Sequence, residues 1–382
     1  MNKSNSQKHK QNVVFFIGAG FTKAIVNTAP IGTEFFLNAF DPHNSFIGDE
    51  RIKDVKKFID NNYYQLKDNH YPNIEDVLSL IDYTIERKEA LSEVYLFEEV
   101  VNVRNKIIYL MGKVIKDNIE KSSEQKKEVS RSFIEKINNL LLKSKKVSII
   151  STNYDIIIDN ALREKIQSCN YGEMLRYNIF LDINGPKRNA RPTTTLNWED
   201  PNISCRGEIN EGGIPLLKIH GSLNWFYCPK CDEVDITVGT KQADDFVEQQ
   251  RRSLCANPMC TSTYEPLLVT PTMLKVYNNT FLQKLWTHSE KIISESNEIV
   301  FIGYSLPEAD YHIRSLLTKA LIKNTNNIRI LVIEKKPLND EDAERIEAVG
   351  DRYNTLFGQD RVTFKPIGLE GMLVQWDALI EE

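Results

Sequence analysis

The chain has 382 residues, of which 41% are hydrophobic and 26% charged, and its formal net charge is -5. These values are ordinary for a globular protein that forms one large domain with insertions, or two domains. An acidic chain without an arginine-dense stripe gives no sign of direct nucleic-acid binding. No apolar run approaches the roughly 20 residues of a membrane span, so no membrane association is expected.

The N-terminus and the cysteines indicate the compartment. Residues 1–12 are polar and basic and lack an apolar core, so we expect a disordered lead-in and no secretory signal. The chain has six cysteines, four of them in two close pairs, which favours metal binding or free thiols over disulfides. The sequence therefore predicts a cytoplasmic protein.

Short apolar runs rich in β-branched and aromatic residues recur along the chain and predict the strands of a sheet. Such continuous runs are typical of parallel strands that are buried on both faces. Helical patterns between them favour an α/β fold with a doubly wound, Rossmann-like parallel sheet, which we place in residues 13–45 and 146–382. The five predicted strands are Val13–Ile17, Val147–Ile150, Pro215–Ile219, Glu298–Ile302 and Ile328–Ile333.

Residues 46–145 have a different pattern, with apolar residues at helical spacing. One set is Ile74, Val77, Leu78, Ile81 and Ile85, and a later one is Val100, Val103, Ile107, Ile108 and Met111. This spacing places each set on one face of a helix. We therefore predict a helical insertion module between the first two strands of the sheet.

The first predicted strand ends in the turn Gly18-Ala19-Gly20 before a helical segment that includes Phe21 and Thr22. Such a turn lets backbone amides approach a phosphate, and the start of a helix favours negative charge. Lys23 stands where the third glycine of the usual dinucleotide fingerprint would fall. A turn that serves only tight packing is the alternative, and the turn alone does not decide between them.

Two other strand ends carry polar residues that suit catalysis. Thr152, Asn153 and Asp155 follow the second strand, and an asparagine there offers a donor and an acceptor to ribose hydroxyls. The alternative is that one of these side chains caps the next helix. His220 ends the third strand beside Gly221, which suits a general base with room for a substrate, although a structural histidine is the alternative.

The last two predicted strands end in residues that suit nucleotide binding. Gly303-Tyr304-Ser305 follows one strand, and Ser305 either donates to a phosphate or caps a helix that begins near Pro307. Glu334 ends the other strand, where a carboxylate holds ribose hydroxyls in other dinucleotide sites. A solvated charge at a strand end is the alternative for Glu334.

The paired cysteines have the spacing of a zinc site. Cys228 and Cys231 form a C-x-x-C pair, and Cys255 and Cys260 form a C-x4-C pair 23 residues further on. Four thiolates in two knuckles complete a tetrahedral zinc with no open position, so the predicted zinc is structural. We place it in a small zinc-ribbon module at residues 225–263. A redox pair at Cys228 and Cys231 is the alternative, but it leaves the second pair without a role.

In this order, the motifs resemble the sirtuin superfamily. Gly18-Ala19-Gly20-Phe21-Thr22 is similar to its glycine turn, and Ser151-Thr152-Asn153-Tyr154-Asp155 to its Thr-Gln-Asn-Ile-Asp segment. Ile219-His220-Gly221 matches its catalytic histidine motif, the cysteine pairs its zinc ribbon, and Gly303-Tyr304-Ser305 its later turn. The match is best with the bacterial sirtuin-like branch of anti-phage defence.

The chain departs from protein-deacylating sirtuins after the glycine turn. Those proteins continue with Gly-Ile-Pro-Asp-Phe-Arg, whereas this chain has Ala29-Pro30-Ile31-Gly32-Thr33-Glu34-Phe35, without an arginine. Their Phe-Gly-Glu segment is also missing, and the most similar stretch at that place in the sequence is Tyr264-Glu265-Pro266-Leu267. The resemblance therefore favours NAD+ hydrolysis to nicotinamide and ADP-ribose. A deacylase or ADP-ribosyltransferase, and a sensor of NAD or ADP-ribose without catalysis, remain the alternatives.

The resemblance also implies roles for the residues. Asn153 would orient the nicotinamide ribose or the attacking water, His220 would act as general base, and Asp155 would position the nicotinamide end or support the loop. Gly18, Ala19, Gly20 and Thr22 would take the pyrophosphate, and Gly303, Ser305 and Glu334 would line the adenosine side. Phe21, Thr152 and Tyr304 would also belong to the cofactor-binding site. Zinc would be structural.

The resemblance further implies defence by NAD depletion, as a homo-oligomer, with a HerA/FtsK-type ATPase as a separate partner. We expect the helical insertion and the segment Leu369–Ile380 to offer assembly surfaces.

Overall fold

The computed structural model describes most of the chain. The described residues are 11–26, 32–63, 71–121, 124–168, 176–178, 213–232, 234–236, 255, 259–269, 279–308 and 310–381. All but the last two residues of the predicted lead-in lie outside this set, as do residues 29–31 of the segment that differs from deacylating sirtuins.

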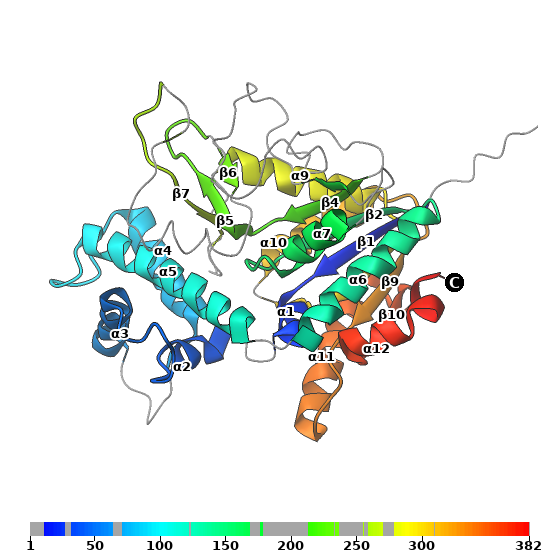
Figure 1. The fold of residues 1–382 in the computed structure, drawn as a ribbon, viewed down its shortest axis with the longest axis horizontal. Coiled ribbons are helices and arrows are strands. Elements are labelled where there is room, and N and C mark those ends of the chain that lie inside the picture. The colour runs from blue at the N-terminus through cyan, green and yellow to red at the C-terminus, as the bar shows by residue number, and fades with distance from the viewer. Residues whose placement is uncertain are drawn as a thin grey trace, which may run out of the picture.

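The described residues form two sheets with helices around them (Figure 1). The strands are β1 (Asn12–Ile17), β2 (Lys146–Ser151), β3 (Arg176–Asn178), β4 (Gly213–Lys218), β5 (Gly221–Tyr227), β6 (Val234–Ile236), β7 (Glu265–Leu268), β8 (Glu298–Ile302), β9 (Arg329–Ile333) and β10 (Val362–Lys365). The α-helices are α1 (Ala19–Ile25), α2 (Phe35–Ala39), α3 (Glu50–Asn62), α4 (Ile74–Arg87), α5 (Phe97–Lys121), α6 (Glu124–Leu142), α7 (Ile157–Ser168), α9 (Thr280–Ser294), α10 (Tyr311–Lys323), α11 (Asp340–Phe357) and α12 (Gly368–Val374).

The larger sheet confirms the predicted doubly wound α/β fold. Its seven strands lie in the order β10-β9-β8-β1-β2-β4-β3, and every neighbouring pair is parallel. From β1 the chain builds the sheet outward through β2 and β4, and later returns to the other side of β1 with β8. The strand order therefore reverses between β1 and β8, and ligands bind at such a switch point in open α/β sheets.

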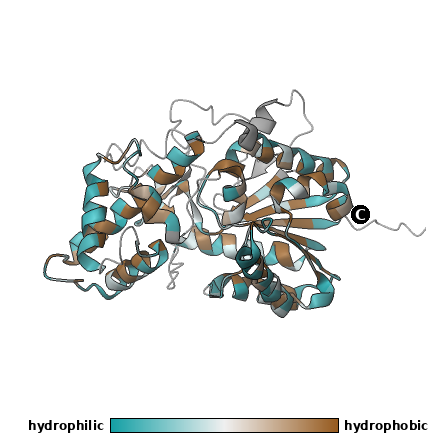
Figure 2. Cartoon of the chain, turned by 90° about the horizontal axis from the view of Figure 1, so that it is seen from below, coloured by the Kyte–Doolittle hydropathy of each residue, from teal (hydrophilic) through white to brown (hydrophobic). Residues whose placement is uncertain are grey.

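Helices cover both faces of this sheet, which explains the continuous apolar runs of its strands (Figure 2). Successive side chains of a strand point to opposite faces. Phe15 accordingly packs against Phe133 of α6 and Trp376, with ring centroids 5.4 and 5.7 Å apart. Phe16 packs on the other face against Phe301, 5.1 Å away, which in turn contacts Tyr353 of α11. Both phenylalanines of β1 are completely buried.

The helices α2 to α5 share a second hydrophobic cluster, and Figure 1 shows them to one side of the large sheet. The cluster includes Phe36, Phe58, Leu78 and Val100, whereas Phe133 of α6 belongs to the core around the sheet. Tyr154, from the loop after β2, packs against the helical cluster. The cluster therefore reaches a loop at the carboxyl edge of the sheet. The boundaries 46 and 145 of the insertion stay a prediction.

The smaller sheet is antiparallel, in the order β6-β5-β7, and β5 follows directly on the turn that holds His220. This sheet was not predicted from the sequence. Cys228, Cys255 and Cys260 lie buried with Phe226 and Tyr264 in a cluster of their own at its end.

One expectation from the sequence is wrong. The helix expected to begin near Pro307 begins at Tyr311. The residues before it are held by side chains: Arg314 donates to the carbonyls of Leu306 and Pro307, and Asp310 accepts from the Tyr304 hydroxyl. Ser305 is therefore no helix cap.

Part of the apolar surface of the segment Leu369–Ile380 faces inward, while Val374 is exposed, so an assembly surface on this segment stays a prediction. Leu369, Met372, Trp376 and Ile380 are buried in the core around the large sheet. Among the described helices, none combines the length and the apolar character needed to cross a bilayer.

Candidate active site

The predicted site residues follow the carboxyl ends of parallel strands. Gly18 comes after β1, Asn153 after β2, His220 after β4, Gly303 after β8 and Glu334 after β9. Because these strands are parallel neighbours, their carboxyl ends lie along one edge of the sheet. The structure thus brings the strand-end residues to the edge at which ligands bind in this class of fold.

The glycine turns after β1 and β8 pack directly against each other at the switch point. The amide of Gly18 donates to Ile302 O at 3.0 Å, and the amide of Gly20 donates to Gly303 O at 2.8 Å. A Cβ atom on Gly18 would lie 2.6 Å from Gly303 O, and one on Gly20 would lie 2.7 Å from Gly303 Cα. The close approach of the two backbones therefore requires these glycines, and a packing role is established for them.

The amides of this turn are largely used inside the protein. Besides the two amides above, that of Phe21 donates to Gly18 O at 3.0 Å, and the Phe21 side chain is buried. Ala19 is exposed, and among the described residues its amide has no hydrogen-bond acceptor. Thr152 is partly exposed and bonds to Ile17 O through its amide and hydroxyl. The turn can therefore meet an anion at Ala19, with Gly18 and Gly20 shaping the approach.

Asn153 is held in one orientation by the turn after β1. Its Nδ2 donates to Gly18 O at 2.9 Å and to Thr22 Oγ1 at 3.0 Å. A backbone carbonyl accepts only, so the amide nitrogen must lie on that side. The side-chain Oδ1 receives no hydrogen bond from the described residues, and Asn153 is partly exposed. The arrangement presents a carbonyl oxygen as an acceptor at the edge of the sheet.

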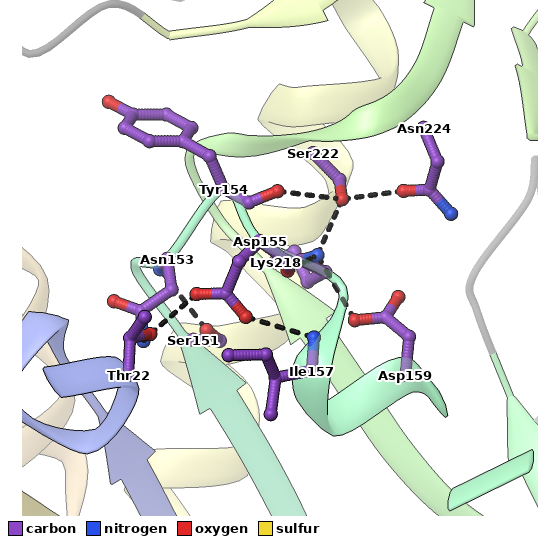
Figure 3. Close-up of polar contacts among 10 residues, drawn as sticks. All are labelled: Thr22, Ser151, Asn153, Tyr154, Asp155, Ile157, Asp159, Lys218, Ser222 and Asn224. Atoms are coloured by element: carbon purple, nitrogen blue, oxygen red, sulfur yellow. Dashed lines mark hydrogen bonds and ion pairs between the residues drawn. The ribbon is translucent and has the colours of Figure 1, made fainter. Parts of the chain in front are cut away.

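Both carboxylate oxygens of Asp155 bind protein groups (Figure 3). Oδ2 accepts from the Thr22 hydroxyl at 2.5 Å, and Oδ1 accepts from the amide of Ile157, the first residue of α7, at 2.9 Å. Asp155 thus joins α1 to the start of α7, and its bond to the amide of Ile157 is the cap that the alternative interpretation predicts. Burial raises the pKa of Asp155, and the nearby Lys218 ammonium opposes the rise.

Lys218 is a buried group that was not predicted from the sequence. It is the last residue of β4, and its side chain is fully buried. Its Nζ donates to Asp155 O at 2.5 Å, Asp159 Oδ2 at 3.1 Å and Ser222 Oγ at 2.5 Å. The sequence does show a lysine inside the apolar run Pro215–Ile219. The groups that bind its ammonium lie on other elements, so its role could not be read from the sequence.

His220 is buried between two aromatic rings. Its ring centroid lies 6.3 Å from that of Tyr154 and 6.3 Å from that of Trp286 of α9. The Trp286 indole donates to Ile219 O at 2.9 Å, which fixes that ring beside the turn. Gly221 follows with a φ of 78°, and a Cβ there would lie 2.1 Å from Leu267 O. Glycine after the histidine is thus required by backbone conformation and by the contact with β7.

The residues after β8 and β9 divide into buried and exposed groups. The Tyr304 hydroxyl donates to Asp310 Oδ2 at 2.6 Å, and burial raises its pKa well above the usual value. Ser305 is exposed, and its carbonyl accepts from Arg352 Nε at 3.0 Å. Glu334 is partly exposed, Oε1 accepts from the amide of Lys335, and burial raises its pKa. Ser305 and Glu334 are accessible to a ligand, whereas the Tyr304 side chain is structural.

The four cysteine sulfurs lie close enough together to hold one metal ion. All of them lie within 4.8 Å of one another, with Cys228 Sγ 3.6 Å from Cys260 Sγ and Cys231 Sγ 3.4 Å from Cys255 Sγ. Four thiolates around a tetrahedral zinc stand about 3.8 Å apart. Burial opposes ionisation of Cys228, but the amides of Lys230 and Cys231 donate to its sulfur and lower its pKa to about 7. The set fits zinc.

These observations define an α/β protein that has polar groups along the carboxyl edge of its large sheet, around the switch point. It also has a four-cysteine cluster at the end of its small sheet. The family model of the SIR2-like domain matches residues 147–354, more than half of the chain. The chain therefore belongs to the SIR2-like domain family, and the predicted resemblance to the sirtuin superfamily is confirmed at that level. No curated protein matches the chain.

Solved structures of Sir2 proteins are similar to the chain over nearly its whole length. One is Sir2Tm bound to a propionylated peptide, with 11% identity, coverage of 97% of this chain and 93% of that chain, and a TM-score of 0.40. Another is a complex of Sir2 with a p53 peptide and NAD+, with 11% identity, the same coverage and a TM-score of 0.39.

Proposed function

We propose that the protein hydrolyses NAD+ to nicotinamide and ADP-ribose. The observation that carries the proposal is the orientation of Asn153, whose amide nitrogen binds Gly18 O and Thr22 Oγ1. Its Oδ1 is thereby left to accept from a water molecule or a ribose hydroxyl at the edge of the sheet. Membership of the SIR2-like domain family supports the choice of substrate.

In the proposed reaction, the bond between C1′ of the ribose and the nicotinamide nitrogen breaks, and its electron pair leaves with nicotinamide. Positive charge develops on the ribose, water attacks C1′, and one proton is released for each NAD+ consumed. Asn153 orients the ribose or the water, and His220 accepts the proton from the water or from a ribose hydroxyl. A site that fixes these groups before the substrate arrives lowers the barrier by orientation.

The remaining strand ends would bind the rest of the dinucleotide. In this proposal the pyrophosphate lies against Ala19, with Gly18, Gly20 and Thr152 forming the wall of the turn. Ser305 and Glu334 bind the adenosine side, next to Gly303. Asp155 supports the loop by holding Thr22, which is the second of its two predicted roles. Zinc bound by the four cysteines would be structural and take no part in the reaction.

The test is an assay of the purified full-length chain with NAD+ and without any acceptor. We expect nicotinamide and ADP-ribose to form in equal amounts. Removing a positioned catalytic group costs about 100-fold or more, so Asn153→Ala and His220→Ala should each lower the rate by at least this factor. The matched control is Asn62→Ala, because Asn62 of α3 is another asparagine whose amide donates to a backbone carbonyl, Phe58 O at 2.8 Å. It should keep the rate within about twofold.

The outcomes separate the alternatives. Nicotinamide release that requires an added acyl-lysine peptide would identify a deacylase, and transfer of ADP-ribose to an added protein would identify a transferase. NAD+ binding without turnover, unaffected by either substitution, would identify a sensor. Absence of turnover with and without the product of a neighbouring gene would refute hydrolysis.

We further propose that the reaction serves phage defence by depleting NAD. An enzyme that consumes a central cofactor must be restrained, and family resemblance suggests homo-oligomers and a separate HerA/FtsK-type ATPase as the restraining partner. The measurement is cellular NAD after phage infection, in cells with wild type or His220→Ala and with or without the ATPase gene. An unchanged NAD level in infected wild-type cells would contradict this role.

A further inference from the structure

The buried Lys218 ammonium connects the loops of the proposed site. Its three N–H groups meet three acceptors, namely Asp155 O, Asp159 Oδ2 and Ser222 Oγ, at 2.5, 3.1 and 2.5 Å. These acceptors come from the loop after β2, from α7 and from β5 (Figure 3). One charged group therefore joins the turn between β4 and β5 to the segment Asp155–Asp159, which lies 59 to 63 residues earlier in the chain.

The turn that carries His220 is closed by this contact. Lys218 and Ser222 lie two residues before and two residues after His220, and Nζ bonds to the Ser222 hydroxyl across the turn. Ser222 Oγ also lies 2.6 Å from Asn224 Oδ1 and 3.3 Å from Tyr154 O, so the hydroxyl can donate onward. The backbone of His220 is thus fixed relative to β5 and to the loop after β2.

The same ammonium holds the segment of Asn153. It binds the backbone carbonyl of Asp155, whose carboxylate accepts from Thr22, and Thr22 accepts from Asn153. Three hydrogen bonds and the covalent bonds of Asp155 thus connect Lys218 to the amide of Asn153. Lys218 therefore contacts both segments that carry the proposed catalytic groups, although its side chain has no exposed surface for a substrate.

Packing alone does not generally call for a buried charge. Replacing a buried ion pair by apolar residues of similar volume is often neutral or stabilising, whereas a buried ammonium with full hydrogen bonding fixes its neighbours in one arrangement. We propose that Lys218 is a positioning residue for the reaction, setting the relative placement of the Asn153 loop and the His220 turn. The inference rests on the proposed NAD+ hydrolysis.

Three variants test the role of Lys218. Lys218→Met removes the ammonium and keeps much of the stem, but it leaves the Asp159 carboxylate buried without this partner and risks misfolding. Lys218→Met combined with Asp159→Asn removes both charges and avoids that risk. Ser222→Ala keeps the ammonium and removes the contact across the His220 turn, together with the contacts of the hydroxyl to Asn224 Oδ1 and Tyr154 O. The control is Met372→Ala, because Met372 is fully buried in α12 and no part of it belongs to the site.

The steady-state rates separate positioning from general stability. For the double variant we expect kcat per folded molecule to fall at least about 10-fold with KM within about threefold, since Lys218 cannot touch NAD+. For Ser222→Ala we expect a smaller fall in kcat of the same kind. Met372→Ala should lower the unfolding temperature and leave kcat per folded molecule unchanged. A kcat of the double variant within twofold of wild type, or a change in KM alone, would overturn the inference.

A readout independent of turnover keeps the two proposals apart. The chain has six histidines, and the imidazole NMR signal of His220 is identified by its loss in His220→Ala. The double variant should shift or broaden this signal, whereas Met372→Ala should leave it in place. An unperturbed His220 signal overturns the positioning role. A perturbed signal supports that role even if wild type fails to release nicotinamide, which would refute only the hydrolysis.

Discussion

Replacing Gly303 by alanine tests the close packing of the two glycine turns. Gly303 has a φ of 59°, and a Cβ there would lie 2.4 Å from the amide nitrogen of Phe21 and 2.5 Å from Gly20 Cα. The nearest atoms belong to backbone, so no side-chain rotation relieves the contact. The turns must move apart, which also weakens the hydrogen bond from Gly20 N to Gly303 O, now 2.8 Å long.

The expected cost follows from three contributions. The left-handed conformation costs alanine about 1 kcal/mol, overpacking about 1–3 kcal/mol, and a weakened hydrogen bond about 0.5–1 kcal/mol. We therefore expect Gly303→Ala to lower the free energy of unfolding by about 2.5–5 kcal/mol. Urea unfolding of the purified variant and wild type measures this difference.

The matched control is Gly358→Ala, at the end of α11. Gly358 has a φ of 87°, but a Cβ there would meet no atom within 4 Å. Its replacement should therefore cost only the conformational contribution, about 1 kcal/mol. If Gly303→Ala is no more destabilising than Gly358→Ala, the two turns are not in contact as described, and the packing role of Gly18 and Gly20 is refuted as well.

Three further predictions follow from the site and its surroundings. Thr22→Val removes the hydroxyl that joins Asn153 to Asp155 and should lower NAD+ turnover about 10-fold, whereas Thr22→Ser should retain most of it, and equal rates would contradict the network. Metal analysis should find about one zinc per chain, and Cys231→Ser should lose most of it, so a wild type well below one zinc refutes the four-thiolate site. The pKa of Asp49 in the folded protein is about 2, below the usual 3.8, chiefly because the guanidinium of Arg51 donates to its carboxylate. The ionised carboxylate therefore stabilises the fold above pH 4, and this effect is lost as the pH falls toward 2. Asp49→Asn should therefore cost about 1 kcal/mol in unfolding free energy at pH 7 and progressively less below pH 4, and a gap that does not change with pH contradicts this.

The large sheet was predictable because its strands are buried on both faces. Val13–Ile17 and Ile299–Ile302 are continuous apolar runs, and the observed strands agree with them to within a residue. β10 was not predicted, since Val362–Lys365 is a short and only partly buried edge strand. β5 was not predicted either, because its sequence continues directly from the His-Gly-Ser turn.

The strand-end residues could be read from the sequence, but their partners could not. A polar residue directly after an apolar strand is visible locally, which is how Asn153 and His220 were found. The burial of Lys218 depends on Asp159 and Ser222, which approach it from α7 and β5. Likewise, the choice between a phosphate turn and a packing turn at Gly18 depends on Gly303, 285 residues later in the chain.

The small antiparallel sheet and the helical cluster of α2 to α5 both contact the candidate site through residues that lie in or next to the loops of that site. β5 begins one residue after His220 and ends at Tyr227, next to Cys228 of the cysteine cluster. Tyr154 packs on the helical cluster, its hydroxyl donates to Val269 O at 2.6 Å, and its ring lies beside His220. In the proposed reaction, neither the small sheet nor the helical cluster needs to touch the substrate to influence catalysis. If the cysteines hold zinc, its loss would affect the position of His220 through β5 alone. A change in the helical cluster would affect the same imidazole through Tyr154.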